Sequence, residues 1–167
     1  MKKEIITLNN EVLRVKAEKI SEPTSLSIKA IIKNMRDTLK KTPNGVGLAA
    51  PQIGISQKIF IIDQKLAKQL QISDVFINPE ITRRSFRKEK LEEGCLSVPG
   101  IYGFIKRHKI VEAKALNEFG QEFTIKTSGL LAQIIQHEVD HLGGILFIDK
   151  ATGIFKVEKE KQRNLKS

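Results

Sequence analysis

The stretch SGLLAQIIQHEVDHLGGIL, residues 128–146, determines how the rest of the chain is interpreted. Its apolar residues recur at helical spacing, Ser128 is a favourable N-cap residue, and Gly143 with Gly144 provides a stop signal. The stretch therefore predicts a buried helix of about four turns. It also places two histidines and a glutamate in a segment that otherwise has the composition of a protein core.

His137 and His141 are four residues apart, so their side chains project from one face of this helix and can bind one ion. With Glu138 they form the motif H-E-x-x-H, in which the histidines bind a metal and the glutamate acts as general base on the attacking water. A single histidine on an apolar helix face is more often a hydrogen-bonded core residue. Two histidines at this spacing with a glutamate between them favour a metal site.

The length and cysteine content are typical of one cytoplasmic domain. A chain of 167 residues can bury a single core without help from disulfides. Cys95 is the one cysteine, so an intrachain disulfide is excluded and a reducing compartment is indicated. The N-terminal residues have no apolar run typical of a signal peptide, and no segment has the length of a membrane span. We therefore expect no membrane partner.

The chain is basic, with 29 Lys and Arg against 19 Asp and Glu and a net charge of +10. This surplus favours approach to polyanions such as RNA, and transient contact with a ribosome is one interpretation. A solvated basic surface is the other. One Tyr and no Trp give little support to a dedicated nucleic-acid groove, so we expect no DNA partner. Residues 155–167 are predicted to form a short basic tail, either a solvated helix or a frayed end, behind a catalytic domain of residues 1–154.

The remaining elements predict an α+β fold. Apolar residues at steps of three and four over residues 25–41 indicate an amphipathic helix, which turn-forming residues end. Short apolar runs and a hairpin signal indicate antiparallel strands that surround the buried helix with the metal motif. The predicted strands are residues 58–62, 75–77, 109–116 and 122–126, with 83–90 as an exposed strand or loop.

The stretch GVGLAAPQ, residues 45–52, is predicted to be a loop of small residues that ends on the amide Gln52. Small residues allow a backbone to approach a ligand closely and leave its N–H and C=O groups free to pair with a peptide. The stretch is not a phosphate-binding loop, because no Gly-Lys-Ser or Gly-Lys-Thr follows. Taken alone, a tight-packing turn is the simpler interpretation.

A catalytic metal site needs about three protein ligands, so one more is required beside the two histidines. Cys95 stands in EGCLS, residues 93–97, where a glycine leaves room beside the thiol. A lone cysteine is also often a small buried apolar residue. Glu93 or Glu92 could complete the site instead, as in metalloproteases, and spacing does not decide among them.

Three stretches taken together, GVGLAAPQ, EGCLS and QHEVDH (residues 136–141), closely resemble the three signature motifs of peptide deformylases, in the same order. The resemblance extends through PGIYG (residues 99–103) and ALNEFG (residues 115–120). It implies an enzyme that hydrolyses the formyl group from the N-terminal formyl-methionine of nascent polypeptides and releases formate. It also implies one divalent metal, usually iron(II), where zinc, nickel or cobalt can also bind.

By matching motifs, the resemblance assigns the metal to Cys95, His137 and His141, and the acid/base role to Glu138. The side chain of Gln52 and the backbone N–H of Leu96 match the family's oxyanion donors, which stabilise the charge that develops on the formyl oxygen.

The substrate contacts are expected around this centre. Leu130 and Ile134 precede the histidines at helical steps and would floor a pocket for the methionine side chain, with Leu91 as a further wall. Backbone groups of Val46, Gly47 and Gly100 could pair with the peptide. Glu93 and Gly94, next to the predicted cysteine ligand, complete the expected set.

Two further residues bear on the helix and the family comparison. Asp140 is expected to pair with Arg107 and hold the helix, unless it is a simple surface aspartate. Tyr102 stands where many bacterial deformylases have an arginine.

Two other functions stay open from the residues alone: an endopeptidase of the H-E-x-x-H type and a non-catalytic, basic ribosome-associated domain. Neither needs Cys95, Gln52 and Glu138 together.

Overall fold

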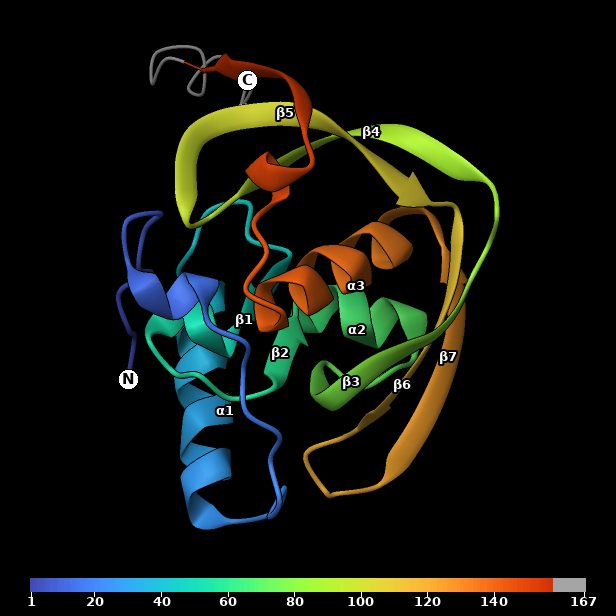
Figure 1. Cartoon of the computed structure of the whole chain (residues 1–167). Helices are drawn as coiled ribbons and strands as arrows, with labels where there is room; N and C mark the ends of the chain where they lie inside the picture. Colours follow the sequence, from blue (N-terminus) through green and yellow to red (C-terminus); the bar gives the residue numbers. More distant parts are fainter. Residues whose placement is uncertain (158–167) are drawn as a thin grey trace.

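The computed structural model describes residues 1–157, so most of the predicted tail, residues 158–167, lies outside the described residues. The strands form a five-stranded sheet in the order β1-β2-β3-β6-β7 and a three-stranded sheet in the order β4-β5-β8, and every pair of neighbours is antiparallel (Figure 1). The predicted α+β class is confirmed. The strands are β1 Gly47–Ala49, β2 Ile59–Ile62, β3 Val75–Arg84, β4 Lys88–Cys95, β5 Val98–His108, β6 Ile110–Leu116, β7 Glu122–Ser128 and β8 Thr152–Lys156, and the α-helices are α1 Leu26–Lys40, α2 Gln64–Leu70 and α3 Gly129–Leu142.

Helix α3, which carries the H-E-x-x-H motif, lies between the two sheets (Figure 1). Ser128 is its N-cap residue and Gly143 its C-cap residue, at the two positions that the sequence predicts. Ser128 has extended backbone geometry, but its hydroxyl makes no capping hydrogen bond. Most of the side chains of α3 are buried, and this holds for its polar residues Gln136, Glu138 and His141 as well. Polar groups in such a position need partners or a function.

The five-stranded sheet separates two apolar layers. Ile59 and Ile61 of β2 pack into a cluster with the buried face of α1, whereas Phe60 and Ile62 pack into a second cluster with α3. All four side chains are buried, because both faces of this strand are covered. A strand covered on both faces appears in the sequence as a continuous apolar run. The sheet thus holds α1 on one side and the motif helix on the other.

Some elements differ from the sequence prediction. Only residues 45–46 of the predicted loop 45–52 are irregular: residues 47–49 form β1, and residues 50–52 belong to a 3-10 helix, η2 Ala50–Ile53. Strand β3 continues to Arg84, beyond the predicted end at residue 77, and residues 83–90 contain its end and the start of β4. Helix α2 is not predicted at all. Three-residue strands and helices of two turns are too short to show a recognisable period.

The predicted domain boundary after residue 154 falls within β8, which pairs with β5. Phe155 therefore belongs to the sheet, where its ring stacks on Tyr102 with 6.0 Å between the ring centroids. Among residues 1–157, no helix is both long and apolar enough to cross a membrane.

Substitution of Phe76 tests the packing of the core between the five-stranded sheet and α3. Its fully buried ring stacks on Phe60, with 4.5 Å between centroids, and meets Phe123 edge-on. Phe76→Ala is expected to lower the free energy of unfolding by about 3–5 kcal/mol, measured by urea denaturation. The matched control is Phe119→Ala, since that ring is 70% exposed, and its effect is expected to stay within about 0.5 kcal/mol. Equal effects of the two substitutions would contradict this packing.

Candidate active site

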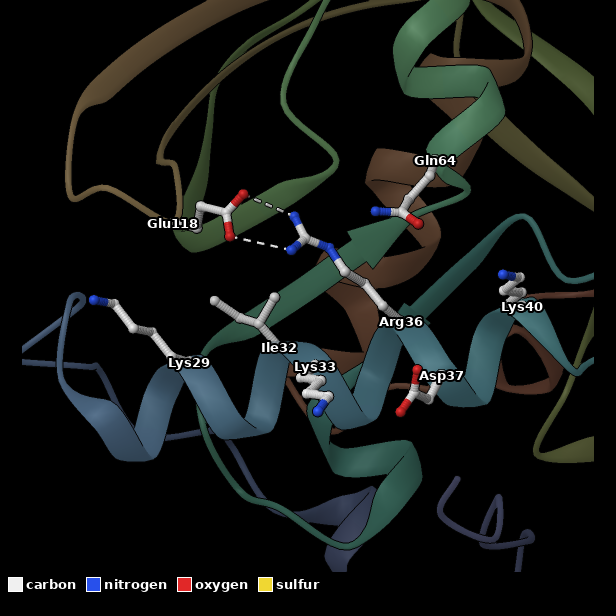
Figure 2. Close-up of a pocket in the computed structure, with 8 residues that line it drawn as sticks. All are labelled: Lys29, Ile32, Lys33, Arg36, Asp37, Lys40, Gln64 and Glu118. Atoms are coloured by element: carbon white, nitrogen blue, oxygen red, sulfur yellow. Dashed lines mark hydrogen bonds and ion pairs between the residues drawn. The ribbon is translucent and has the colours of Figure 1, made fainter. Parts of the chain in front are cut away.

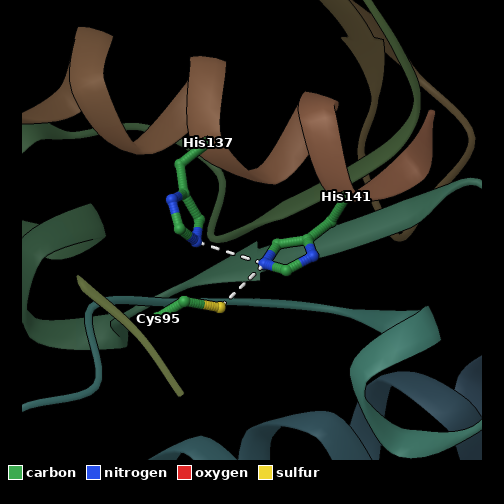
Figure 3. Close-up of side chains that lie close together, drawn as sticks. All are labelled: Cys95, His137 and His141. Carbon is green, nitrogen blue, oxygen red and sulfur yellow. Dashed lines mark hydrogen bonds between the residues drawn. The ribbon is translucent and has the colours of Figure 1, made fainter. Parts of the chain in front are cut away.

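Cys95 meets the two histidines of α3 at the interface of the sheets. Its Sγ lies 3.2 Å from His141 Nε2, and that nitrogen lies 3.1 Å from His137 Nε2. The three ligand atoms all lie within 4.8 Å of one another and point toward a common centre (Figure 3). One thiolate and two imidazoles are a donor set for a divalent transition metal. The residues present therefore fit a metal of this kind.

Glu93 lies behind His137 and outside the group of ligand atoms. Its Oε1 accepts a hydrogen bond from His137 Nδ1 at 2.6 Å, and its carboxylate also pairs with the buried guanidinium of Arg107. Burial alone would raise the pKa of Glu93, but the hydrogen bonds from His137 and Arg107 lower it to about 2. A carboxylate at Nδ1 orients the imidazole so that Nε2 faces the centre. The side chain of Glu92 is exposed.

Arg107 also pairs with Asp140 of α3, as the sequence predicts, with 2.6 Å between Nη1 and Oδ2. The second oxygen of Asp140 accepts a hydrogen bond from Lys150 at 2.9 Å. Lys150 has no motif or period around it, so nothing in the sequence indicates this contact. The ion pairs join β4, β5 and α3 directly behind the candidate ligand His137.

Glu138 is buried beside the candidate ligands, and among residues 1–157 its Oε2 has no hydrogen-bond partner. Burial raises the pKa of Glu138 to about 7. Gly47 of β1 makes room for this side chain, because a Cβ atom at position 47 would lie 2.5 Å from Glu138 Oε1. A buried carboxylate oxygen without a partner is costly unless it has a function, which makes Glu138 a candidate proton carrier.

Gln52 lies in η2 with its amide fixed at both ends. Its Oε1 accepts a hydrogen bond from Ala49 N–H at 2.8 Å, and its Nε2 lies 3.2 Å from Ser97 Oγ and 3.7 Å from Cys95 Sγ. The NH₂ group thus faces the cysteine. Leu96 lies in the two-residue turn that joins β4 to β5, directly after that cysteine.

The N-terminal residues 6–8 connect η2, which carries Gln52, to the turn between β4 and β5 that follows Cys95. Ile6 N–H donates to the carbonyl of Gln52 at 2.9 Å, and Leu8 N–H donates to the carbonyl of Ser97 at 3.0 Å. Nothing in the sequence of residues 1–12 indicates this role, because backbone pairing of a single extended segment leaves no pattern in side chains.

The expected substrate contacts lie on several sides of the centre. Ile134 is buried next to Gly47, whereas Leu130 is 54% exposed and Leu91 is partly buried. Gly94 lies under the ring of Tyr102, and the carbonyl of Gly100 accepts a hydrogen bond from Val157 N–H. The carboxylate of Glu93 is engaged by His137 and Arg107. Contact of these residues with a substrate stays a prediction.

Comparisons of the sequence and of the structure with known proteins identify the same family. The sequence model of the polypeptide deformylase family matches residues 2–157. A peptide deformylase of Natranaerobius thermophilus is 43% identical over 157 residues, which are 94% of this chain and 97% of that protein.

Among solved structures, peptide deformylase from Thermotoga maritima has a TM-score of 0.82 and 36% identity, covering 91% of this chain and 99% of that one. A class I type b peptide deformylase from Acinetobacter baumannii, solved with Met-Ala-Ser bound, has a TM-score of 0.79 and 32% identity over 90% of this chain and 98% of that one. The chain belongs to the polypeptide deformylase family.

Proposed function

We propose that Cys95, His137 and His141 hold the divalent metal of this deformylase, and that Glu138, Gln52 and the Leu96 N–H carry out the reaction beside it. The enzyme removes the formyl group from the N-terminal formyl-methionine of new polypeptides. The observation that carries the proposed roles is the convergence of the three ligand atoms beside a buried, unpaired carboxylate oxygen. A bound divalent ion would polarise the formyl carbonyl and lower the pKa of the attacking water.

Iron(II) is the metal we propose for the native enzyme. A thiolate donates more charge to the ion than a third imidazole would and suits a softer ion. Zinc, nickel and cobalt accept the same donors and can occupy the site in purified protein. Elemental analysis of freshly prepared protein, kept anaerobic, distinguishes them.

Glu138 moves the proton in this proposal. Its free oxygen accepts a proton from the attacking water and later donates it to the nitrogen of the leaving peptide amine. Gly47 and the packed α3 hold the carboxylate in one position, so little reorganisation is needed between the two transfers.

Gln52 and Leu96 stabilise the negative charge on the formyl oxygen. The NH₂ group of Gln52 is pre-oriented, because Ala49 N–H holds its oxygen on the opposite side. A donor fixed before the reaction costs no reorganisation when charge develops, and removal of one such donor typically costs about 2.7–4 kcal/mol.

The substrate backbone is proposed to pair with β1. This strand forms an edge of the five-stranded sheet, since β2 is its one neighbour there. An edge strand offers backbone N–H and C=O groups to an added peptide strand, which here would involve Val46 and Gly47. Leu91, Leu130 and Ile134 would surround the methionine side chain. The Acinetobacter baumannii relative, which binds Met-Ala-Ser, supports a peptide site of this kind.

The proposal also includes the compartment in which the enzyme acts and its contact with the ribosome. We expect the enzyme to act in the cytoplasm on nascent chains, where transient contact with the ribosome would bring it to its substrate. The catalytic unit is proposed to extend through the whole of β8, to Lys156.

Formate release tests the reaction and Glu138 together. Iron-loaded protein is expected to release formate from formyl-Met-Ala-Ser, and Glu138→Ala is expected to keep its metal while kcat falls about 10²- to 10⁴-fold. The assay pairs formate detection with metal analysis of the same samples. Absence of formate with the wild-type enzyme would overturn the function, whereas unchanged kcat in a metal-loaded Glu138→Ala would remove Glu138 from the mechanism.

Cys95→Ala tests the ligand set. Loss of the thiolate leaves two ligands, so the variant is expected to lose most of its bound metal during dialysis, as measured by elemental analysis. Ser97→Ala is the control, because it lies in the same turn but keeps all three ligand atoms. Equal metal content in Cys95→Ala and wild type would show that the thiol is not a ligand.

Gly47→Ala tests the space beside Glu138. The added methyl group would lie 2.5 Å from Glu138 Oε1 and 3.1 Å from Ile134 Cγ2, so the carboxylate must move. We expect kcat to fall at least about tenfold while the metal content stays that of wild type. Gly143→Ala is the matched control, since a Cβ there meets nothing closer than 3.4 Å. A Gly47→Ala enzyme with normal kcat would contradict the proposed position of Glu138.

A further inference from the structure

Helix α1 presents a row of basic side chains that the reaction does not use. Lys29, Lys33, Arg36 and Lys40, here called the α1 basic face, follow one another at steps of four, three and four. This spacing places them on one side of the helix. They line a surface pocket of about 240 Å³ that Gln64 and Glu118 border on the opposite side (Figure 2).

The acidic side chains near the α1 basic face, Asp37, Asp74 and Glu118, already have hydrogen-bond partners. Arg36 bonds to both oxygens of Asp74 at 2.7 Å and to both oxygens of Glu118 (Figure 2 shows the latter pair), while Asp37 accepts a hydrogen bond from the Met1 amine at 2.9 Å.

The three lysines, in contrast, are exposed and take part in no ion pair within residues 1–157. Their charges are therefore available to an external anion. They extend over about 16 Å of helix, since each residue adds about 1.5 Å.

The chemistry of the pocket favours a repeating phosphate backbone. None of its eight lining residues is aromatic, so it has no surface on which unpaired bases could stack. Point charges on flexible lysine stems suit phosphates that recur along a line. The net charge of +10 adds a general attraction for such a polymer.

We propose that the α1 basic face binds the phosphate backbone of double-helical RNA. RNA is the polyanion closest to a nascent polypeptide, which is the substrate of this enzyme. The inference goes beyond the deformylase reaction, and its test does not depend on turnover.

The position of α1 is compatible with simultaneous catalysis. The buried side of α1 packs on β2 and its neighbours, while the predicted metal ligands lie with α3 beyond the opposite face of the sheet. Figure 1 places α1 at the bottom of the view and β8 at the top. RNA bound along α1 would therefore leave the active site open to a peptide.

The test compares two triple variants of the full-length protein. Lys29→Gln with Lys33→Gln and Lys40→Gln removes the free charges of the α1 basic face. Lys88→Gln with Lys106→Gln and Lys126→Gln removes three equally exposed charges from β4, β5 and β7 and gives the same net charge. Binding to a fluorescent RNA hairpin is measured by anisotropy at salt concentrations from about 50 to about 200 mM.

For wild type, each phosphate contact is expected to add about −0.9 to the slope of log K against log salt. The α1 variant is expected to bind at least about tenfold more weakly at low salt and to lose about 2.7 of this slope. The β-strand variant is expected to bind like wild type. Formate release from a short formyl peptide should be unchanged in both variants, which shows that they fold and separates this test from that of the active site.

Three outcomes would overturn the inference. The first is the absence of salt-dependent binding of wild type to the hairpin. The second is an equal loss of hairpin binding in both triple variants, which would assign binding to net charge alone. The third is tighter binding of the α1 basic face to vesicles with anionic lipids than to the hairpin, which would assign that face to a membrane surface.

Discussion

The buried guanidinium of Arg107 joins the parts of the molecule on which the active site depends. A guanidinium taken out of water needs compensating charge, and two carboxylates supply it: Glu93 from the neighbouring strand and Asp140 from α3. The β4–β5 hairpin can therefore dock on α3 in few ways. Removal of one partner of a buried pair of this kind typically costs about 3–5 kcal/mol, because the other charge stays buried without compensation.

The same ion pairs position the candidate ligand His137. Both oxygens of Glu93 accept hydrogen bonds from Arg107, and Oε1 also accepts one from His137 Nδ1. The position of the hairpin on the helix and the orientation of the imidazole are thus set by one carboxylate. Gln52 reaches the centre from η2, and the backbone hydrogen bonds of Ile6 and Leu8 connect η2 to the turn after Cys95. The site is assembled from four separate segments, so its precision depends on tertiary packing.

The sequence predicts those features that a local pattern carries. Helix α3 has a clear period, a cap position and a stop, and its limits are confirmed. Helix α1 and the hairpin of β6 and β7 have equally local signals, and the pairing of Asp140 with Arg107 is also confirmed. The family resemblance brings together Cys95 and the two histidines, which spacing alone left open.

What the sequence does not show depends on contacts between distant segments. Residues 47–49 form a strand because β2 pairs with them and both faces are covered, which leaves no alternation of apolar and polar residues. The long β4–β5 hairpin is rich in charge, so it has the composition of an exposed loop, yet it buries Glu93 and Arg107. By sequence, Glu93 could be a metal ligand or a substrate contact. Its place behind His137 follows from the fold alone.

The separation of the ligands along the chain has a consequence for the protein's lifetime. Cys95 belongs to one sheet, and His141, 46 positions later, belongs to the helix beneath it. An ion shared by these residues would act as a reversible cross-link that closes a long loop and restricts the unfolded chain. Metal binding and folding would then be linked, so the supply of metal in the cell would affect how much of this enzyme survives proteolysis as well as how much of it is active.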